Sequence, residues 1–291
     1  MITLISELTK RVPRITHQIF RTSQEINRLL SRDDSRSQLL ASIINATRKR
    51  QFSPDEKLWL DKINLLRNEL NSTSTLVTIV DYGAGAPDIE RSQEEMYQGK
   101  TVILPVSEIS RKASLRHIWP LLLFKIIRGF RPNTCLELGT CLGISTSYQA
   151  AALALNGKGR IITIEGADQL AKLANNNFRK LNLANVISVT GRFQDTLSVI
   201  LQKHSPVDHA FIDGHHDMQA TLSYFHQITP HLANESVLLF DDIHWSRGMK
   251  NAWDIIRSDS RVKISVDLFA MGICVMSNSL NTKDHYTIAL G

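Results

Sequence analysis

The sequence lacks an apolar run long enough to cross a membrane. Its longest such run, Ile118 to Ile127, is interrupted by a lysine and falls far short of the roughly 20 residues that a transmembrane helix needs. No basic segment followed by an apolar stretch stands near Met1, so no secretory signal is expected. The three cysteines, Cys135, Cys141 and Cys274, match no disulfide or metal-ligand spacing and indicate reduced thiols. These absences predict a cytoplasmic protein.

Other absences narrow the class of protein. Aromatic residues make up only 7%, and no Gln/Asn-rich, Pro-rich or Gly/Ser-rich tract occurs, which argues against a low-complexity assembly protein. A dense basic surface is also lacking. The net charge is +6, but in residues 1–72 the 13 Lys and Arg alternate with 8 Asp and Glu, and only Arg48-Lys49-Arg50 is a cluster. We therefore expect no nucleic-acid partner. With 43% hydrophobic residues, the chain has enough apolar side chain for a real core.

The first part of the chain predicts a helical cap region over residues 1–110. In residues 1–72 apolar positions recur at intervals of three and four, and Ser53-Pro54-Asp55-Glu56 is typical of a helix start. Their apolar faces must be buried, either over the mouth of an active site or in a homodimer. Residues 73–110 are mixed, and one helix is expected from about Ser107 to Phe130.

The second part, residues 111–291, predicts a Rossmann-like domain. From Thr134 onward, short apolar runs alternate with helical stretches over five units, which is typical of a parallel sheet with helices on both faces. The runs near Val262–Phe269 and Gly272–Met276 have only a tight turn between them and therefore predict an antiparallel pair. The expected fold class is α/β: a doubly wound, mostly parallel sheet with an antiparallel C-terminal edge hairpin.

A glycine loop follows the first strand of this series, in the sequence Glu137-Leu138-Gly139-Thr140-Cys141-Leu142-Gly143. Ligands of such sheets bind at the carboxyl ends of the strands, and glycines permit a tight turn and close approach. The dinucleotide pattern G-x-G-x-x-G fails, because Cys141 occupies its middle position. A carboxylate at Glu137 would repel a diphosphate and attract an ammonium group. The loop therefore favours a cofactor that carries an amine.

An acid also ends the second strand. Glu165 lies 28 residues after Glu137, where a carboxylate can bond both ribose hydroxyls of a nucleoside cofactor. A site for a nucleoside and an amine, without phosphate, describes S-adenosylmethionine. We expect Thr140, Gly143 and Gly166 to belong to the same cofactor site.

The run Glu137 to Thr146 resembles motif I of metal-dependent O-methyltransferases of the catechol and caffeoyl-CoA types, which are class I S-adenosylmethionine-dependent enzymes. The resemblance implies that Glu137 and Gly139 lie near the methionine moiety, Ser145 near its carboxylate and Glu165 on the ribose. Residues 191–195 resemble the adenine-side loop of that family, which implicates Gly191, Phe193 and Gln194. The stretch from Val80 to Ile288, including Asp241-Asp242-Ile243-His244-Trp245, also resembles a group of bacterial methyltransferases. That second resemblance supplies no substrate.

A second glycine-rich loop, Asp81-Tyr82-Gly83-Ala84-Gly85, also follows an apolar run. No acid follows it at the required distance and no strand–helix series surrounds it. We interpret it as a turn that joins the N-terminal helices to the sheet domain, and a share in the substrate pocket stays open.

Three aspartates mark the expected reaction centre. Asp213 ends the fourth strand, and Asp241 and Asp242 end the fifth, so all three should converge beside the cofactor, which Asp213 is also expected to contact. Carboxylates so close repel one another unless a cation or a proton is shared. Oxygen ligands suit a hard divalent ion, Mg²⁺ first and Mn²⁺ or Ca²⁺ next. The usual set in the O-methyltransferases is Asp, Asp, Asn, and the Asp-Asp version resembles metal-binding sugar O-methyltransferases of antibiotic pathways.

Two histidines, His215 and His216, follow Asp213 directly and are the candidate general bases. Unperturbed histidine titrates near 6.5, which suits proton acceptance at neutral pH. The lysine or acid that related families use is not reproduced, and His215 is slightly favoured. His244 and Trp245 are expected to line the pocket.

These residues predict an S-adenosylmethionine-dependent methyltransferase that methylates a hydroxyl of a small molecule with the help of a divalent metal. The alternatives are methylation of a small-molecule or peptide amine, and a non-catalytic S-adenosylmethionine-binding module. A binding module needs neither three converging aspartates nor two histidines. A nicotinamide-dependent oxidoreductase is disfavoured by Glu137 and Cys141.

Overall fold

An eight-stranded sheet forms the centre of the computed structural model, which describes residues 21–85, 91–115 and 118–290. Across the sheet the strands follow the order β10 (Asp284–Thr287), β8 (Val262–Asp267), β9 (Met271–Ser277), β7 (Leu232–Asp241), β6 (Val207–Ile212), β3 (Thr134–Leu138), β4 (Arg160–Glu165) and β5 (Val186–Thr190). Strands β3 to β7 are parallel to one another, whereas β9 is antiparallel to both β7 and β8. The predicted Rossmann-like sheet with an antiparallel C-terminal pair is confirmed.

The strand order reverses beside β3, and this position fixes where a ligand can bind. The chain runs outward from β3 through β4 to β5, then returns to place β6 on the other side of β3. The loops after β3 and β6 therefore part from each other at the carboxyl edge of the sheet. In parallel sheets this reversal opens the crevice that holds the ligand.

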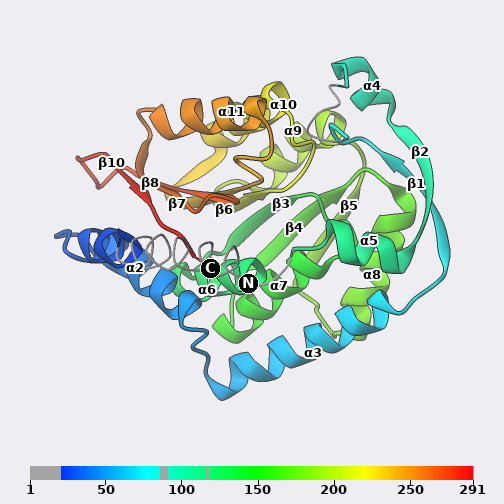
Figure 1. The fold of residues 1–291 in the computed structure, drawn as a ribbon, viewed down its shortest axis with the longest axis horizontal. Helices are drawn as coiled ribbons and strands as arrows, with labels where there is room; N and C mark the ends of the chain where they lie inside the picture. Colours follow the sequence, from blue (N-terminus) through cyan, green and yellow to red (C-terminus); the bar gives the residue numbers. More distant parts are fainter. Residues whose placement is uncertain (1–20, 86–90, 116–117, 291) are drawn as a thin grey trace, which may run out of the picture.

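Helices cover both faces of the sheet (Figure 1). One face carries α9 (Phe193–His204), α10 (Met218–Ile228), which continues into a 3₁₀ turn at Thr229–His231, and α11 (Arg247–Ser258). The other carries α6 (Trp119–Phe130), α7 (Ile144–Asn156) and α8 (Asp168–Lys180). Because both faces are covered, strands such as β3 are buried along their whole length. Within the described part of the chain, no helix combines the length and the apolar character that crossing a membrane requires.

The N-terminal helices bury their apolar faces against this domain itself. Helix α3 (Pro54–Asn71) begins with a reciprocal capping box between Ser53 and Glu56, and its buried residues share a core cluster with α6 and α7. Helix α2 (Ser35–Arg48) packs against α6 in a second cluster. The buried faces of these helices therefore pack on α6 and α7 and do not cover the mouth of a site, and the predicted homodimer stays a prediction.

Residues 21–30 are helical and lie against the last strand of the sheet. The Arg28 guanidinium stacks over the Tyr286 ring at 4.2 Å, and the Ala289 amide donates to Thr22 Oγ1 at 3.2 Å. Ile26 and Leu29 belong to the same buried cluster as Ile288 and Leu290, which follow β10. The two ends of the described chain are thus joined in one core.

The single helix predicted from Ser107 to Phe130 is two helices, α5 (Val106–Ala113) and α6. Ser114 leaves α5 in an extended conformation, with φ −92° and ψ 137°. Pro120 lies in the first turn of α6, where its missing N–H and fixed φ suit a helix start and would disrupt a helix interior. The apolar periodicity continues across the break, which is why the sequence alone predicts one helix.

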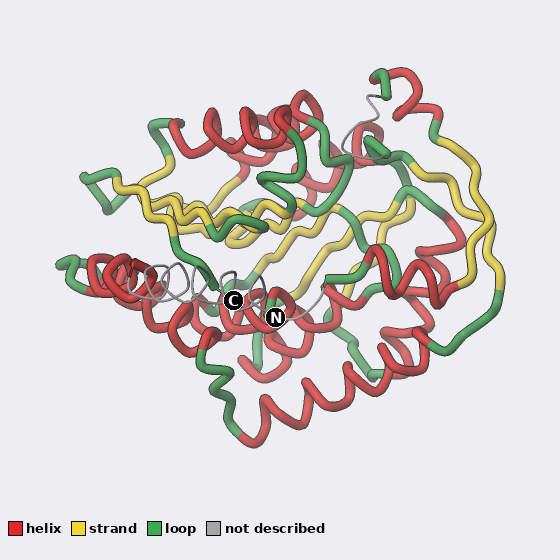
Figure 2. Tube along the Cα trace, in the orientation of Figure 1, coloured by secondary structure: helices red, strands yellow, loops and turns green. Residues whose placement is uncertain are grey.

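A two-stranded antiparallel ribbon stands apart from the main sheet (Figure 2). It pairs β1 (Leu76–Asp81) with β2 (Lys100–Pro105), and the short helix α4 (Gln93–Gln98) precedes β2. Ile79 pairs with Val102, and both are half-buried, whereas Leu76 and Ile103 are 65% and 63% exposed. The ribbon therefore has an inward and an outward face, and it carries the Asp81–Gly85 loop.

Candidate active site

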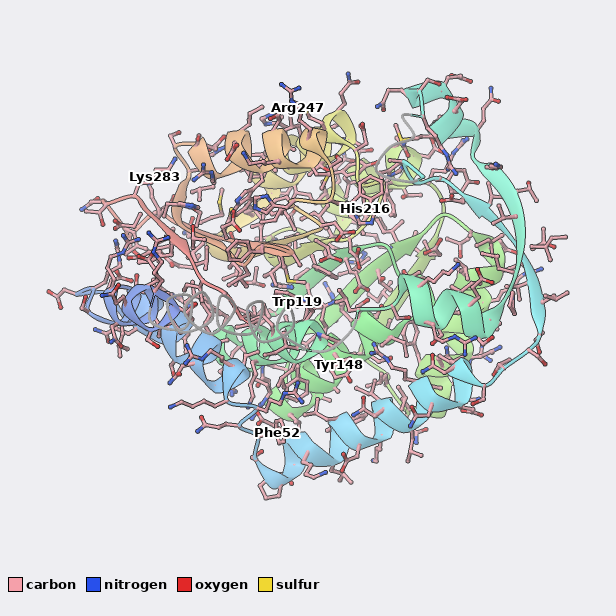
Figure 3. All side chains as sticks on the ribbon, in the orientation of Figure 1. Phe52, Trp119, Tyr148, His216, Arg247 and Lys283 are labelled. Carbon is pink, nitrogen blue, oxygen red and sulfur yellow. The ribbon has the colours of Figure 1, made fainter. Side chains whose placement is uncertain are left out.

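A cavity of about 630 Å³ opens at the carboxyl ends of β3, β4, β6 and β7. Its floor is made by the loops that follow these strands. Its opposite wall comes from segments that precede β3 in the chain: the inward face of the β1–β2 ribbon, helix α5, and Trp119 at the start of α6. His216 and Trp119, which both line the cavity, come from these two different sides (Figure 3). The site is therefore built jointly by both predicted regions of the chain.

The glycine loop after β3 is shaped by close backbone approaches. Gly139 has φ +105°, and a side chain there would collide with the carbonyl oxygen of Asp213. Gly143 caps α7 with φ +78°, and a side chain there would lie 2.5 Å from the Phe178 ring. Gly139, Thr140 and Ser145 line the cavity, whereas Gly143 serves helix packing. The two glycines of the motif thus have different tasks.

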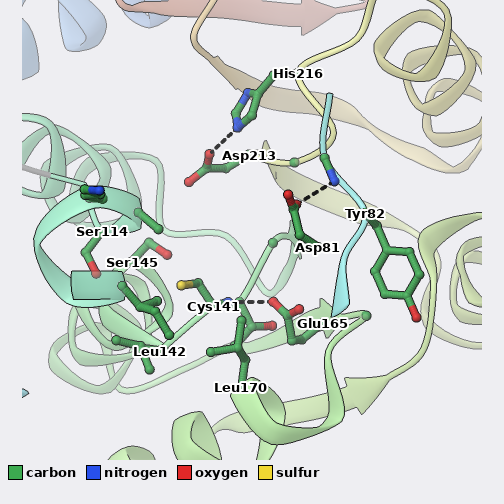
Figure 4. Close-up of a pocket in the computed structure, with 18 of the residues that line it drawn as sticks. Asp81, Tyr82, Ser114, Cys141, Leu142, Ser145, Glu165, Leu170, Asp213 and His216 are labelled. Carbon is green, nitrogen blue, oxygen red and sulfur yellow. Dashed lines mark hydrogen bonds and ion pairs between the residues drawn. The ribbon is translucent and has the colours of Figure 1, made fainter. Parts of the chain in front are cut away.

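Glu165 is fixed beside this loop (Figure 4). One oxygen of its carboxylate accepts the Cys141 amide and the other accepts the Ala167 amide, each at 2.8 Å. Burial raises the pKa of Glu165, and the backbone donors oppose that rise. Glu165 and the following Gly166 both line the cavity. The Cys141 amide, which a diphosphate in this loop would require, already has a partner.

Glu137 lies elsewhere than predicted. Its side chain is fully buried, and it is absent from the cavity wall. Its carboxylate accepts hydrogen bonds from the Thr146 hydroxyl, from Gln149 Nε2 at 2.7 Å and from Thr163 Oγ1 at 2.6 Å. The sequence predicts Glu137 in the cofactor site near the methionine moiety, but its side chain does not line the cavity: it points between β3 and α7 and holds the glycine loop from behind.

Glu137 should make stability depend on pH. Burial raises its pKa to about 7, against 4.5 in an unfolded chain. Between these pH values the folded state binds the extra proton, so the free energy of unfolding falls as pH rises. The difference corresponds to about 3 kcal/mol. Glu137→Gln removes this titration, so we expect the wild-type protein to lose about 3 kcal/mol relative to the variant from pH 4.5 to 7.5. Urea unfolding over that range measures it, and parallel stability curves would contradict the assignment.

The loop after β5 supplies fewer cavity residues than predicted. Phe193 lines the cavity, and its ring lies edge-on to His215 with 5.3 Å between centroids. Gln194 does not line it; its Nε2 lies 3.3 Å from His215 Nε2. Gly191 is also outside the wall, and a side chain there would meet Thr196. Arg192, which the prediction omitted, lines the cavity instead.

The three aspartates do converge. Asp213, Asp241 and Asp242 all line the cavity, and a hydrogen bond joins the side chains of Asp213 and Asp241. Burial, followed by the charge of Asp242, raises the pKa of Asp241 to about 7. Burial and both neighbouring aspartates raise the pKa of Asp213. A proton shared by Asp213 and Asp241 relieves their repulsion in this arrangement.

The same side chains do not form a metal-ligand set. Among residues 21–85, 91–115 and 118–290, no three His, Cys, Asp or Glu side chains are arranged to hold one metal ion. His216 stands between two of the predicted ligands, with Nε2 at 3.7 Å from Asp213 Oδ1 and Nδ1 at 3.8 Å from Asp242 Oδ2. The oxygen chemistry of the aspartates suits a hard divalent ion, but their spacing as described does not.

The two histidines have different surroundings. His215 is buried, with Nδ1 at 2.9 Å from the Tyr224 hydroxyl and Nε2 near Gln194, so both ring nitrogens have partners. Burial lowers the pKa of His215 to about 4. The His216 side chain is 26% exposed, and its ring lies more than 3.5 Å from the nearest carboxylate oxygens of Asp213 and Asp242 and beside the Trp245 ring. Burial also lowers the pKa of His216.

Backbone strain is concentrated at this cavity. Cys141, His215, His216 and Asp242 line it, and all have positive φ, between 49° and 63°. Side chains other than glycine rarely adopt this conformation, which persists only where the surrounding structure enforces it. The strain orients the two histidines, and sequence periodicity gives no sign of it.

His244 and Trp245, predicted to line the pocket, do not. His244 Nε2 lies 2.8 Å from Asp267 Oδ2, and the Trp245 ring packs beside His216 with 5.9 Å between centroids. Asp267 also accepts the Trp253 indole N–H at 3.1 Å. These side chains brace the loop after β7 from outside the cavity.

The structure thus brings together most of the predicted site residues. Those that line the cavity are Gly139, Thr140, Ser145, Glu165, Gly166, Phe193, Asp213, His215, His216, Asp241 and Asp242. The prediction missed the wall formed by the N-terminal part, which includes Asp81, Tyr82, Gly83, Glu108, Lys112 and Trp119. In the sequence, only the Asp81–Gly85 motif gave a signal for this wall. The structure shows that Asp81, Tyr82 and Gly83 of that motif line the cavity.

Comparison with known proteins agrees with this arrangement. Residues 136–243 match a family described as a methyltransferase domain, and no curated protein matches the chain. An O-methyltransferase from Bacillus cereus, solved in complex with S-adenosylhomocysteine, is 22% identical and superposes with a TM-score of 0.50 over 57% of this chain and 84% of its own. A methyltransferase from Podospora anserina, also bound to S-adenosylhomocysteine, is 16% identical, with a TM-score of 0.51 over 58% and 82%. The structural likenesses show the Rossmann-like fold, and the family match marks the part of the chain from β3 to the loop after β7 as similar to methyltransferase domains.

Proposed function

We propose that the protein transfers a methyl group from S-adenosylmethionine to a hydroxyl group of a small molecule. The observation that carries this proposal is Glu165, a carboxylate fixed by two backbone amides at the end of β4, next to the glycine loop. A carboxylate in this position suits the two hydroxyls of a ribose. The two structural relatives described above both hold S-adenosylhomocysteine, the product of this cofactor.

The same loop disfavours a dinucleotide. A diphosphate needs free amides and no nearby negative charge, but Glu165 occupies the Cys141 amide and Asp213 lies on the same cavity wall. A nucleoside without phosphate meets neither obstacle. We therefore expect S-adenosylmethionine to bind and NAD to be excluded.

The reaction is a single displacement at the methyl carbon. The acceptor oxygen forms a bond to this carbon while the carbon–sulfur bond breaks, and the sulfonium becomes a neutral thioether. The proton of the hydroxyl must leave for a base, and the protein must align oxygen, carbon and sulfur. The apolar inward face of the ribbon, with Ile79, Val102 and Leu104, supports an acceptor with an apolar body.

We assign the role of base to His216 and not to its neighbour. Both ring nitrogens of His215 are engaged by Tyr224 and Gln194, whereas the His216 ring is partly exposed on the cavity wall. Asp213 and Asp242 flank the His216 ring and would stabilise the imidazolium formed when it takes the proton.

The carboxylate oxygens of Asp213, Asp241 and Asp242 have the donor chemistry that a divalent cation, Mg²⁺ first, would prefer. Such an ion would lower the pKa of the acceptor hydroxyl. The described arrangement does not fit it directly, because Asp213 and Asp241 are joined by a hydrogen bond and His216 separates Asp213 from Asp242.

Glu165→Ala tests the proposal. Loss of hydrogen bonds to a charged group costs about 1.5–3 kcal/mol, so S-adenosylhomocysteine should bind roughly 10- to 150-fold more weakly in calorimetry. Asp168→Ala is the matched control, since it removes an exposed acid three residues away that does not line the cavity. Binding of NAD but not of S-adenosylhomocysteine by the wild-type protein would overturn the proposal.

The acceptor can be found by labelling. The protein is incubated with host extract and methyl-labelled S-adenosylmethionine, and the fraction that takes up label is isolated. Label on oxygen supports the proposal, whereas label on nitrogen would make the amine alternative correct. The cytoplasmic location and the homodimer stay predictions from the sequence.

A further inference from the structure

The ring of Tyr82, the residue that follows β1, packs between Gly99 and Gly166. A methyl group added at Gly166 would lie 2.8 and 2.9 Å from Cδ2 and Cε2 of the Tyr82 ring. A methyl group added at Gly99 would lie 2.8 Å from Cδ1 and Cε1 on the opposite edge. The ring is thus held against backbone on both edges, and its position is fixed by the absence of two side chains.

The contact with the Tyr82 ring explains why residue 166 is a glycine. Gly99 has φ +71°, a conformation that favours glycine on its own account, but Gly166 is outside the left-handed region. Its backbone could therefore be adopted by any residue. The close approach of the Tyr82 ring is what requires a glycine at position 166.

This contact lies at the nucleoside end of the cavity. Gly166 follows Glu165 directly, and Tyr82, Glu165 and Gly166 all line the cavity. Figure 4 shows Tyr82 reaching from the ribbon toward the Glu165 loop. The ribbon thus meets the edge of β4, where a ribose is expected.

The ribbon is also fastened to the loop on the adenine side. The Arg192 guanidinium stacks on the Tyr97 ring at 3.8 Å, and Arg192 Nη2 donates to the Tyr97 hydroxyl at 2.9 Å. Arg192 is in turn held by Asp195 at 2.6 Å. Tyr97 belongs to α4, which leads into β2 through Gly99, so this contact holds the ribbon over both cofactor loops.

We propose that Tyr82 is a cofactor-binding residue whose ring closes the nucleoside end of the cavity over the adenosine. The proposal rests on the proposed use of S-adenosylmethionine. Glu165 and Phe193 supply walls from the Rossmann-like domain, and Tyr82 supplies the facing wall from outside it. Aromatic rings present a flat apolar face to a base or sugar, and the two glycines fix this one before the ligand arrives, which limits the entropy lost on binding.

The test compares Tyr82→Ala with Tyr82→Phe in calorimetry, with S-adenosylhomocysteine and 5′-methylthioadenosine as ligands. We expect Tyr82→Ala to weaken both ligands by roughly 5- to 150-fold, the range for loss of an aromatic contact to a base. Tyr82→Phe keeps the ring and should bind like the wild type. Because methylthioadenosine lacks the amino-acid end, an equal loss for both ligands locates the contact at the adenosine.

A second pair of variants separates cofactor contact from packing. Gly166→Ala adds a methyl that points at the Tyr82 ring, so it should weaken binding in the wild-type background and have little effect when Tyr82 is already alanine. If Tyr82→Ala lowers thermal stability but leaves the affinity of the folded protein unchanged, while Glu165→Ala weakens binding, the inference is wrong and the proposed function stands. If Glu165→Ala also binds like the wild type, the proposed function itself fails.

Discussion

His216→Ala should reduce the rate of methyl transfer by about 10²- to 10⁴-fold at neutral pH, the usual contribution of a general base. The cofactor affinity should stay within a few fold of the wild type, because the His216 ring faces the carboxylates and not the nucleoside end. The measurement is label transfer from S-adenosylmethionine to the extract fraction that accepts it, at saturating cofactor.

A pH profile separates a base from a structural residue. Burial lowers the pKa of His216, so the wild-type rate should fall only below the ordinary histidine range near 6.5. This acidic limb should be absent in His216→Ala. His215→Ala is the comparison, since His215 is bonded to Tyr224 and should affect thermal stability more than the shape of the profile. A profile that keeps its acidic limb in His216→Ala but loses it in His215→Ala would reverse the assignment.

Asp241→Asn should abolish methyl transfer while S-adenosylhomocysteine binds almost as before. The substitution keeps the size of the side chain but removes the charge that Asp241 shares with Asp213 and Asp242 at the acceptor end. If a divalent ion takes the place of the shared proton, EDTA should also abolish transfer in the wild type and Mg²⁺ or Mn²⁺ should restore it. Asp61→Asn, an exposed acid on α3, is the control.

The chelation experiment shows whether a shared proton or a divalent ion offsets the repulsion among these three carboxylates. Full activity after exhaustive chelation, with no ion found by elemental analysis, would mean that proton sharing is enough and would end the comparison with catechol-type enzymes. Loss of activity without recovery on adding metal would point to damage and not to a metal requirement, so the recovery is the decisive observation. The fold and the cofactor proposal do not depend on either outcome.

The sequence predicts the sheet well because its signals are local. Each strand of the β3–β7 series is a short apolar run followed by a helical pattern, and Glu165 and the three aspartates are found by reading where these runs end. The direction in which a single side chain points is harder to predict from the sequence. Both faces of β3 are buried, so no alternation of polar and apolar residues shows that Glu137 points toward α7. The different surroundings of His215 and His216 are equally hidden in the sequence, because two consecutive left-handed residues set the directions of their rings.

The missing cavity wall has a different cause. Asp81, Tyr82 and Trp119 reach the site through tertiary packing of the ribbon and the N-terminal helices, and no spacing within the chain encodes that approach. The contact between the Tyr82 ring and Gly166 likewise exists only because the fold brings residues 82 and 166 together. Contacts over such separations can be recognised only when the structure is available.

The joining of the two chain ends has a consequence for biosynthesis. The bond between Thr22 and Ala289 spans 267 positions, and Ile26 and Leu29 find cover partly in Ile288 and Leu290. Translation proceeds at about 5–20 residues per second, so the helix of residues 21–30 waits roughly 13–50 s for these partners. During that time its apolar face is exposed to the cell. This core is therefore completed only after Ile288 and Leu290 have been synthesised and have left the ribosome, long after the helix that they cover.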